Sequence, residues 1–85
     1  MEKKLLKETI RNLIIKKFKV KKTKIQKNLS ANNVDRWDSL GHLTLISIFE
    51  KKFKISFKQE EVVKMLSEKE IYSMMVKKIL KRNSY

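Results

Sequence analysis

A serine and a histidine near the predicted start of a helix, Ser39 and His42, are the residues whose types could do chemistry. A serine hydroxyl in the first turn of a helix is exposed, and the free N–H groups and the dipole there favour an anion such as a phosphodiester. The structural alternative is that Asp38 or Ser39 caps the helix. His42 lies three residues along the same helix, not on a separate element facing Ser39 as a general base. We therefore do not expect hydrolase chemistry, and we interpret His42 as an ordinary residue at the edge of the helix.

Length and composition limit the chemistry further. The chain has 85 residues, one histidine and no cysteine, which excludes disulfides and thiol nucleophiles and argues against a metal site. We expect one domain over residues 1–85, too small to enclose a deep catalytic pocket and therefore not an enzyme. Its apolar runs are far shorter than the roughly 20 residues that cross a bilayer. Lys7 and Glu8 interrupt the start, so we expect no signal peptide. We also expect the protein to be a monomer in the cytoplasm.

The elements that must position Ser39 are predicted to be helices, because the chain has no proline and a single glycine. Apolar residues three and four apart define a first helix with Leu6, Ile10, Leu13, Ile14 and Phe18 on one face. A long loop follows over residues 19–38, a length that is usually functional. Its apolar anchors are Val20, Ile25, Leu29, Val34 and Trp37.

Three further helices complete the predicted order of helix, long loop, helix, short helix, helix. The second covers residues 39–53, with Asp35 and Asp38 before it as residue types that favour helix starts. The third covers 59–66, after Phe57 in a short link. The fourth covers 67–81 and opens on a capping box, in which Ser67 and Glu70 satisfy each other's amides. Its apolar face is formed by Ile71, Met74, Met75, Ile79 and Leu80.

The second helix has one apolar residue out of place. At about 100° per residue, its core face is predicted to carry Leu43, Leu45, Ile46, Ile48, Phe49 and Phe53. The opposite arc holds Thr44, Ser47 and Lys51, and Leu40 falls among them. Leu40 is therefore a candidate contact residue next to Ser39, although single exposed leucines are common and need no function.

The tripeptide Asp38-Ser39-Leu40 at the start of the second helix, after a long loop, resembles the prosthetic-group site of acyl carrier proteins. The resemblance covers nearly the whole chain and implies an all-α, four-helix bundle of the acyl carrier protein type. It includes the first-helix stripe, the run Leu43-Ile46-Phe49-Glu50-Phe53, and Ile71 and Ile79 in the closing helix. Trp37 and Gly41-His42-Leu43 are more similar to specialised stand-alone carriers than to the housekeeping carrier of fatty acid synthesis.

The resemblance implies that a phosphopantetheinyl transferase moves 4′-phosphopantetheine from coenzyme A to Ser39. The thiol of the arm would then hold an acyl or aminoacyl group as a thioester for loading ligases and downstream transferases. Asp38 would take part in transferase recognition and Leu40 in contacts with partner enzymes, on the face that also carries Thr44, Ser47 and Lys51. The apolar residues Leu43, Ile46 and Phe49 would line any cavity for a fatty chain.

The charge departs from that family. The formal net charge is +13, and lysine supplies 19 of the 22 basic residues. Such a charge first indicates nucleic acid or an anionic membrane, whereas a compositional bias toward lysine is the plain alternative. Only three arginines are present to read DNA bases, so a basic nucleic-acid-binding module is the lesser hypothesis. A carrier-like interaction subunit without cargo is another.

Typical carriers are acidic along the second helix, whereas this one offers Gly41, Thr44, Lys51 and Lys52 and retains mainly Glu50. Charge complementarity sets partner specificity and association rate. We therefore expect partner enzymes with less basic, even acidic, docking surfaces.

Overall fold

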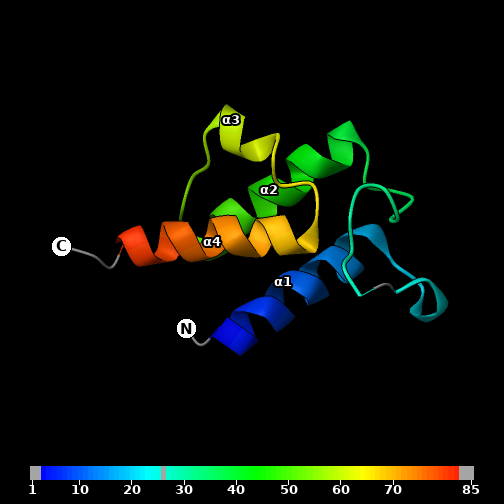
Figure 1. The fold of residues 1–85 in the computed structure, drawn as a ribbon. Coiled ribbons are helices and arrows are strands. Elements are labelled where there is room, and N and C mark those ends of the chain that lie inside the picture. The colour runs from blue at the N-terminus through cyan, green and yellow to red at the C-terminus, as the bar shows by residue number, and fades with distance from the viewer. Residues whose placement is uncertain (1–2, 26, 83–85) are drawn as a thin grey trace.

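The computed structural model describes residues 3–25 and 27–82, which form four α-helices and one 3₁₀ helix (Figure 1). In chain order these are α1 (Lys3–Phe18), η1 (Lys22–Lys24), α2 (Ser39–Phe53), α3 (Gln59–Val62) and α4 (Glu68–Arg82). Among the described residues there is no strand, and the expectation of an all-α chain is confirmed. Within the same residues, no helix combines the length and the apolar content needed to cross a membrane.

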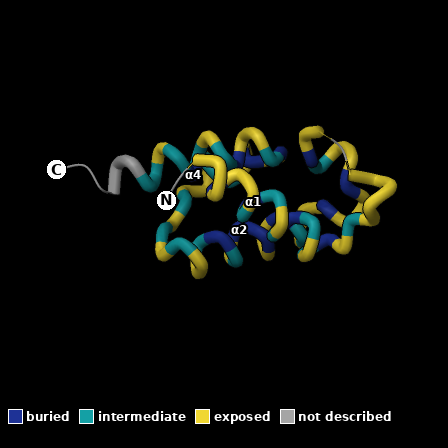
Figure 2. Tube along the Cα trace, turned by 90° about the horizontal axis from the view of Figure 1, so that it is seen from below, coloured by how far each residue is buried: buried dark blue, intermediate teal, exposed yellow. Residues whose placement is uncertain are grey.

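The core lies between the apolar faces of α1, α2 and α4. Buried and exposed residues alternate along each of these helices (Figure 2). The predicted stripe of α1 is largely confirmed, because Leu6, Ile10, Ile14 and Phe18 are buried, while Leu13 is half-buried. The other buried apolar side chains come from α2, from α4 and from the connections: Leu29, Val34, Trp37, Leu45, Ile46, Phe49, Met65, Ile71 and Met75. On α4, Met74 and Ile79 are half-buried, and the side chain of Leu80 falls outside the described ones.

The long first loop is pinned across the helices by three of its five predicted anchors. Leu29, Val34 and Trp37 are buried and Val20 is half-buried, but Ile25 is exposed, contrary to the prediction. Ile25 directly follows η1, which places it on the outside of the loop. The sequence did not indicate η1 because a three-residue helix has no apolar period to detect.

A short pairing between the loop and the start of α4 explains why α3 is shorter than predicted. Ser30 and Ser67 form an isolated antiparallel bridge. The amide of Ala31 donates to the carbonyl of Leu66 at 2.9 Å, and the amide of Glu68 donates to the carbonyl of Leu29 at 2.6 Å. The chain therefore leaves the helix after Val62, turns over residues 63–65 and pairs with the loop at Leu66 and Ser67.

Side-chain contacts cap the start of α4 and join α3 to α4. Half of the predicted capping box is present, because the amide of Glu70 donates to Ser67 Oγ at 3.2 Å. The second contact runs between side chains, with Ser67 Oγ donating to Glu70 Oε1 at 3.1 Å. On α3, Lys78 lies 2.8 Å from Glu61. This hydrogen bond from Lys78, helped by one from the backbone of Lys58, holds the pKa of Glu61 below its ordinary value.

Two helices end in the same way, with lysine where glycine is usual. Lys19 after α1 and Lys54 after α2 both have left-handed backbones, with φ of 52° and 54°. At each end the next amide reaches back five residues, from Val20 to the Ile15 carbonyl at 3.0 Å and from Ile55 to the Glu50 carbonyl at 3.2 Å. These are Schellman ends, whose left-handed position glycine occupies at the lowest cost.

Candidate functional site

Asp38 positions Ser39 by fixing the start of α2. Its backbone is extended and its Oδ1 accepts a hydrogen bond from the amide of Gly41 at 2.7 Å. Its carbonyl accepts from the amide of His42, also at 2.7 Å. Asp38 is therefore the N-cap, the first of the two caps that the sequence allowed, and Asp35 is exposed and takes no such part.

Gly41, the single glycine, allows the chain before α2 to pack closely against the helix. A Cβ at this position would lie 2.7 Å from the carbonyl oxygen of Arg36 and 2.8 Å from Cε1 of Phe18. Both distances are shorter than real Cβ contacts, so any other residue would push α2 away from α1 or from the end of the loop. The glycine thus sets the distance between the first turn of α2 and the end of α1.

Ser39 and Leu40 face outward from this fixed turn. Ser39 is exposed, and among the described residues none hydrogen-bonds its hydroxyl. Leu40 is 75% exposed, which confirms the helical-wheel prediction that it faces away from the core. The same face carries Thr44, Ser47 and Lys51, all exposed, with the Thr44 hydroxyl bonded to the Leu40 carbonyl at 2.9 Å.

His42 is a buried connector, and its interpretation as an edge residue was wrong. Nε1 of Trp37 donates to His42 Nδ1 at 3.0 Å, and His42 Nε2 lies 2.7 Å from the carbonyl oxygen of Val62. Because the indole can only donate, Nδ1 accepts and the proton sits on Nε2, which donates to Val62. His42 is therefore a neutral side chain that joins the loop, α2 and α3, and it does not serve Ser39 as a base.

Three stacked rings support this connector. Phe18 at the end of α1 stacks on Trp37 with ring centroids 5.4 Å apart, and Trp37 stacks on His42 at 6.1 Å. Phe18 and Trp37 are buried, so the stack forms the inner wall behind the first turn of α2. The sequence could have indicated this group only through the spacing of Trp37 and His42, which are five residues apart.

A hollow of about 490 Å³ opens beside Ser39, between α2 and the residues that follow α3. Its apolar wall is formed by Leu43, Val62, Val63 and Leu66, and its rim includes Asp38 and Ser39. Leu43 and Val63 are each 58% exposed. The hollow thus offers a solvent-accessible apolar surface within one helical turn of the serine.

Leu43 corrects the predicted core face of α2. It lines the hollow and is not buried, because the position next to it that faces the core belongs to His42. The buried stripe consists of His42, Leu45, Ile46 and Phe49, and Leu43 lies about 100° from His42 around the helix. Ile46 and Phe49 pack in the core and are not among the residues that line the hollow.

Four carboxylates, those of Asp38, Glu50, Glu61 and Glu70, are engaged by the chain itself. Asp38 caps α2, and Glu50 accepts from the amide of Phe57 at 2.9 Å, which holds the link after α2. Glu61 pairs with Lys78 and Glu70 with Ser67. Glu50, the acidic residue that the second helix retains, is half-buried and has a structural role.

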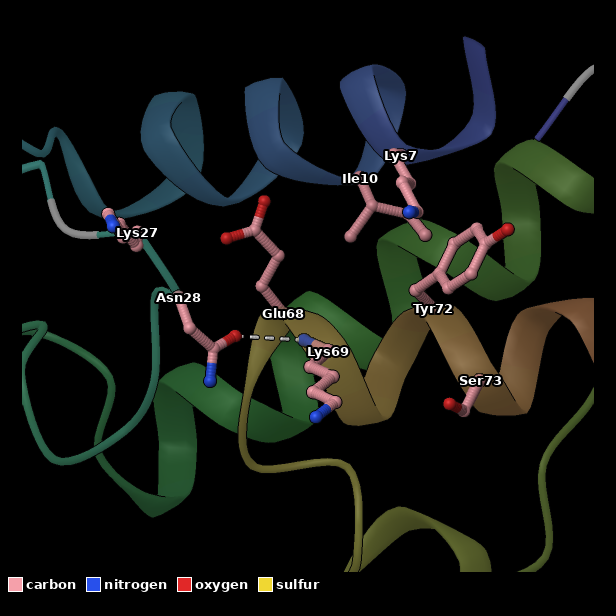
Figure 3. Close-up of a pocket in the computed structure, with 8 residues that line it drawn as sticks. All are labelled: Lys7, Ile10, Lys27, Asn28, Glu68, Lys69, Tyr72 and Ser73. Carbon is pink, nitrogen blue, oxygen red and sulfur yellow. Dashed lines mark hydrogen bonds between the residues drawn. The ribbon is translucent and has the colours of Figure 1, made fainter. Parts of the chain in front are cut away.

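A second hollow, of about 470 Å³, lies between α1 and the start of α4 and contains none of the predicted site residues (Figure 3). Its polar groups hold the loop on the helices. Glu68 Oε1 lies 2.6 Å from the guanidinium of Arg11 and accepts from the amide of Leu29 at 3.1 Å. The amide of Lys69 donates to Asn28 Oδ1 at 3.0 Å. We interpret this hollow as a structural contact region between the loop, α1 and α4.

The start of α2 fits a phosphodiester at Ser39. The first amides of a helix have no acceptors within the helix, and the helix dipole is positive there. Asp38 occupies only the amide of Gly41, and the serine hydroxyl is accessible.

No family model matches the sequence, and no curated protein matches it.

Proposed function

We propose that this chain is a carrier protein of the acyl carrier type, with 4′-phosphopantetheine attached at Ser39. The observation that carries the proposal is the arrangement at the start of α2. An exposed serine hydroxyl follows an aspartate cap, adjoins a leucine that is 75% exposed, and lies on the rim of an apolar hollow. A serine used only to fold the chain would not need this accessibility.

Different residues at this site would hold different parts of the phosphopantetheine group. Ser39 Oγ would provide the ester oxygen, and the first-turn amides of α2 would face the phosphate. Leu43, Val63 and Leu66 would offer apolar contacts along the hollow. When bound, the group supplies a thiol that carries acyl or aminoacyl cargo, and this chain has no thiol of its own.

The proposed partners are a phosphopantetheinyl transferase, a loading ligase and downstream transferases in the cytoplasm, which meet the carrier as a monomer. Leu40 would be the apolar contact at the centre of the docking face, with Thr44, Ser47 and Lys51 beside it and Asp38 contributing to transferase recognition. The exposed side chains on this face include lysine but no carboxylate of α2, because Glu50 is held by Phe57. This arrangement supports partners with acidic docking surfaces.

The first prediction tests the attachment site. Incubation with coenzyme A and a promiscuous phosphopantetheinyl transferase is expected to add the mass of one phosphopantetheine, measured on the intact protein. Ser39→Ala is expected to abolish the addition, because it removes the hydroxyl that forms the ester.

Ser56→Ala is the matched control, since Ser56 is also exposed but lies in the link between α2 and α3. It should be modified to the same extent as the parent chain. No mass increase with several transferases, or an unchanged increase in Ser39→Ala, would rule out the proposal.

A further inference from the structure

The lysines of this chain are concentrated in one segment. Residues 16–24 contain six lysines in nine residues and no carboxylate, whereas the remaining 76 residues contain 13 lysines. A compositional bias alone would spread lysine evenly over the surface, so this local density needs a separate explanation. We call residues 16–24 the lysine segment.

The lysine segment has little internal compensation. Five of its six lysine side chains are exposed, and only Lys17 is half-buried, with its amine 5.6 Å from the ring centroid of Phe18. The two ion pairs found among the described residues, Arg11–Glu68 and Lys78–Glu61, lie elsewhere. Lys16 and Lys17 complement the negative end of the α1 dipole, but the lysines beyond Phe18 have no such role.

The segment also contributes three of the four cations that line a hollow of about 400 Å³. Lys19, Lys21 and Lys24 line it together with Arg36, and Asp35 is the one carboxylate among the lining residues. Asn33, at the same hollow, is occupied by the amide of Ser30 and the carbonyl of Asn28. The accessible groups of this hollow are therefore mainly cationic.

This cationic end adjoins the exposed apolar residues at the start of α2. Phe18, inside the segment, stacks on Trp37, and Gly41 packs against both Phe18 and Arg36. Arg36 precedes Ser39 by three residues, so their Cα atoms lie within about 11 Å of each other. Figure 1 shows the loop and the start of α2 at the same end of the molecule, away from both termini. Leu40, 75% exposed, belongs to this end.

We propose that this end of the molecule docks on the surface of an anionic lipid bilayer. Clustered lysines are attracted to anionic headgroups, and an exposed leucine beside them can enter the interfacial region. The combination of lysines with an exposed aliphatic side chain favours a bilayer over a nucleic acid. Binding of single strands uses exposed aromatic platforms, whereas Phe18 and Trp37 are buried here. The docking does not depend on Ser39 carrying a group.

The second prediction is binding to vesicles of equimolar phosphatidylcholine and phosphatidylglycerol, measured by co-sedimentation of the full chain, with no binding to phosphatidylcholine alone. Each lysine near an anionic surface contributes about fivefold to affinity. The triple variant Lys21→Gln, Lys22→Gln, Lys24→Gln is therefore expected to bind about a hundredfold more weakly. Leu40→Ser is expected to weaken binding several-fold, and both variants should keep the helical circular dichroism of the parent.

The matched control removes three exposed lysines from the opposite end: Lys3→Gln, Lys4→Gln and Lys77→Gln. It loses the same charge and should bind nearly as well as the parent. An equal loss in the control would show attraction by net charge alone and overturn the docking site. Absence of binding to anionic vesicles would overturn it as well.

Binding to a double-stranded DNA fragment of unrelated sequence tests whether the lysines recognise nucleic acid and not a bilayer. The bilayer proposal would be overturned in favour of nucleic acid if the chain bound this DNA more tightly than the vesicles at the same salt and Leu40→Ser had no effect on vesicle binding. Because Ser39→Ala leaves the lysines and Leu40 in place, its vesicle binding should be unchanged. Failure of the carrier proposal and failure of membrane docking are thus separate results.

Discussion

The start of α2 and the lysine segment are in contact, but they differ in whether their polar side chains have partners within the chain. At the start of α2, Asp38 caps the helix and His42 joins three parts of the chain. In the lysine segment, which packs on it through Phe18, five lysines extend into solvent without a carboxylate partner among the described residues. The polar groups of the first region build the fold, whereas those of the second contribute charge.

This difference indicates which residues are open to other roles. Around Ser39, the side chains of Asp38 and His42 have internal partners, whereas Ser39, Leu40 and Leu43 are exposed. In the lysine segment only Phe18 and Val20 have packing roles. Substitutions that remove these partners should therefore lower stability at the first region, whereas removal of a lysine charge at the second should leave it nearly unchanged.

The third prediction, and the largest effect on stability, concerns His42. His42→Ala removes both hydrogen bonds and leaves Trp37 Nε1 without a partner beside a new cavity, while the Val62 carbonyl keeps only the amide of Met65 at 3.2 Å. We expect a loss of about 2–4 kcal/mol in the free energy of unfolding, measured by urea denaturation.

Thr44→Ala is the control on the same helix, because Thr44 is exposed and bonds only to the carbonyl of Leu40. Its effect should stay within about 0.5 kcal/mol. A His42→Ala loss as small as that of the control would mean that the connector does not hold α3 on α2.

The fourth prediction concerns the close packing at Gly41. Gly41→Ala places a methyl group 2.7 Å from a backbone oxygen, and such overpacking costs about 1–3 kcal/mol. The better helix propensity of alanine offsets about 1 kcal/mol. We therefore expect a net loss of about 1 kcal/mol, seen as a lower denaturation midpoint. A more stable variant would contradict the packing, because propensity alone would then decide the result.

Much of this arrangement follows from local rules and could be predicted from the sequence. The bounds of α2, the cap at Asp38 and the exposure of Leu40 depend on residues within one or two helical turns. The stripe of α1 depends on a period of three and four residues. These features are set by contacts that a sequence pattern contains.

The misplaced residues depend on contacts that no local pattern contains. His42 is buried because Trp37 and Val62 satisfy its two nitrogens, and Val62 is 20 residues away in the chain. Its burial in turn places Leu43 beside the hollow. The early end of α3 depends on the pairing of Leu66 with Ala31, which joins the loop to a distant segment. A helical wheel that treats histidine as polar and leucine as buried therefore misplaces both His42 and Leu43.

The fifth and smallest prediction separates backbone from charge within the lysine segment. Lys19 has φ of 52°, a left-handed conformation that costs a residue with a Cβ about 1–2 kcal/mol. Lys19→Gly removes this cost, but glycine loses about 0.5–1 kcal/mol more backbone entropy on folding. We expect a net gain of about 0.5–1 kcal/mol in the free energy of unfolding, measured by urea denaturation.

Lys19→Gln is the matched control, because it removes the charge and keeps the Cβ. It should leave stability unchanged if the amine of Lys19 contributes nothing to the fold, and Lys54→Gly, with the same backbone, should repeat the gain. A gain in Lys19→Gln equal to that in Lys19→Gly would instead trace the effect to repulsion among the lysines. In that case the lysine segment would itself strain the fold, and its contrast with the start of α2 would be sharper still.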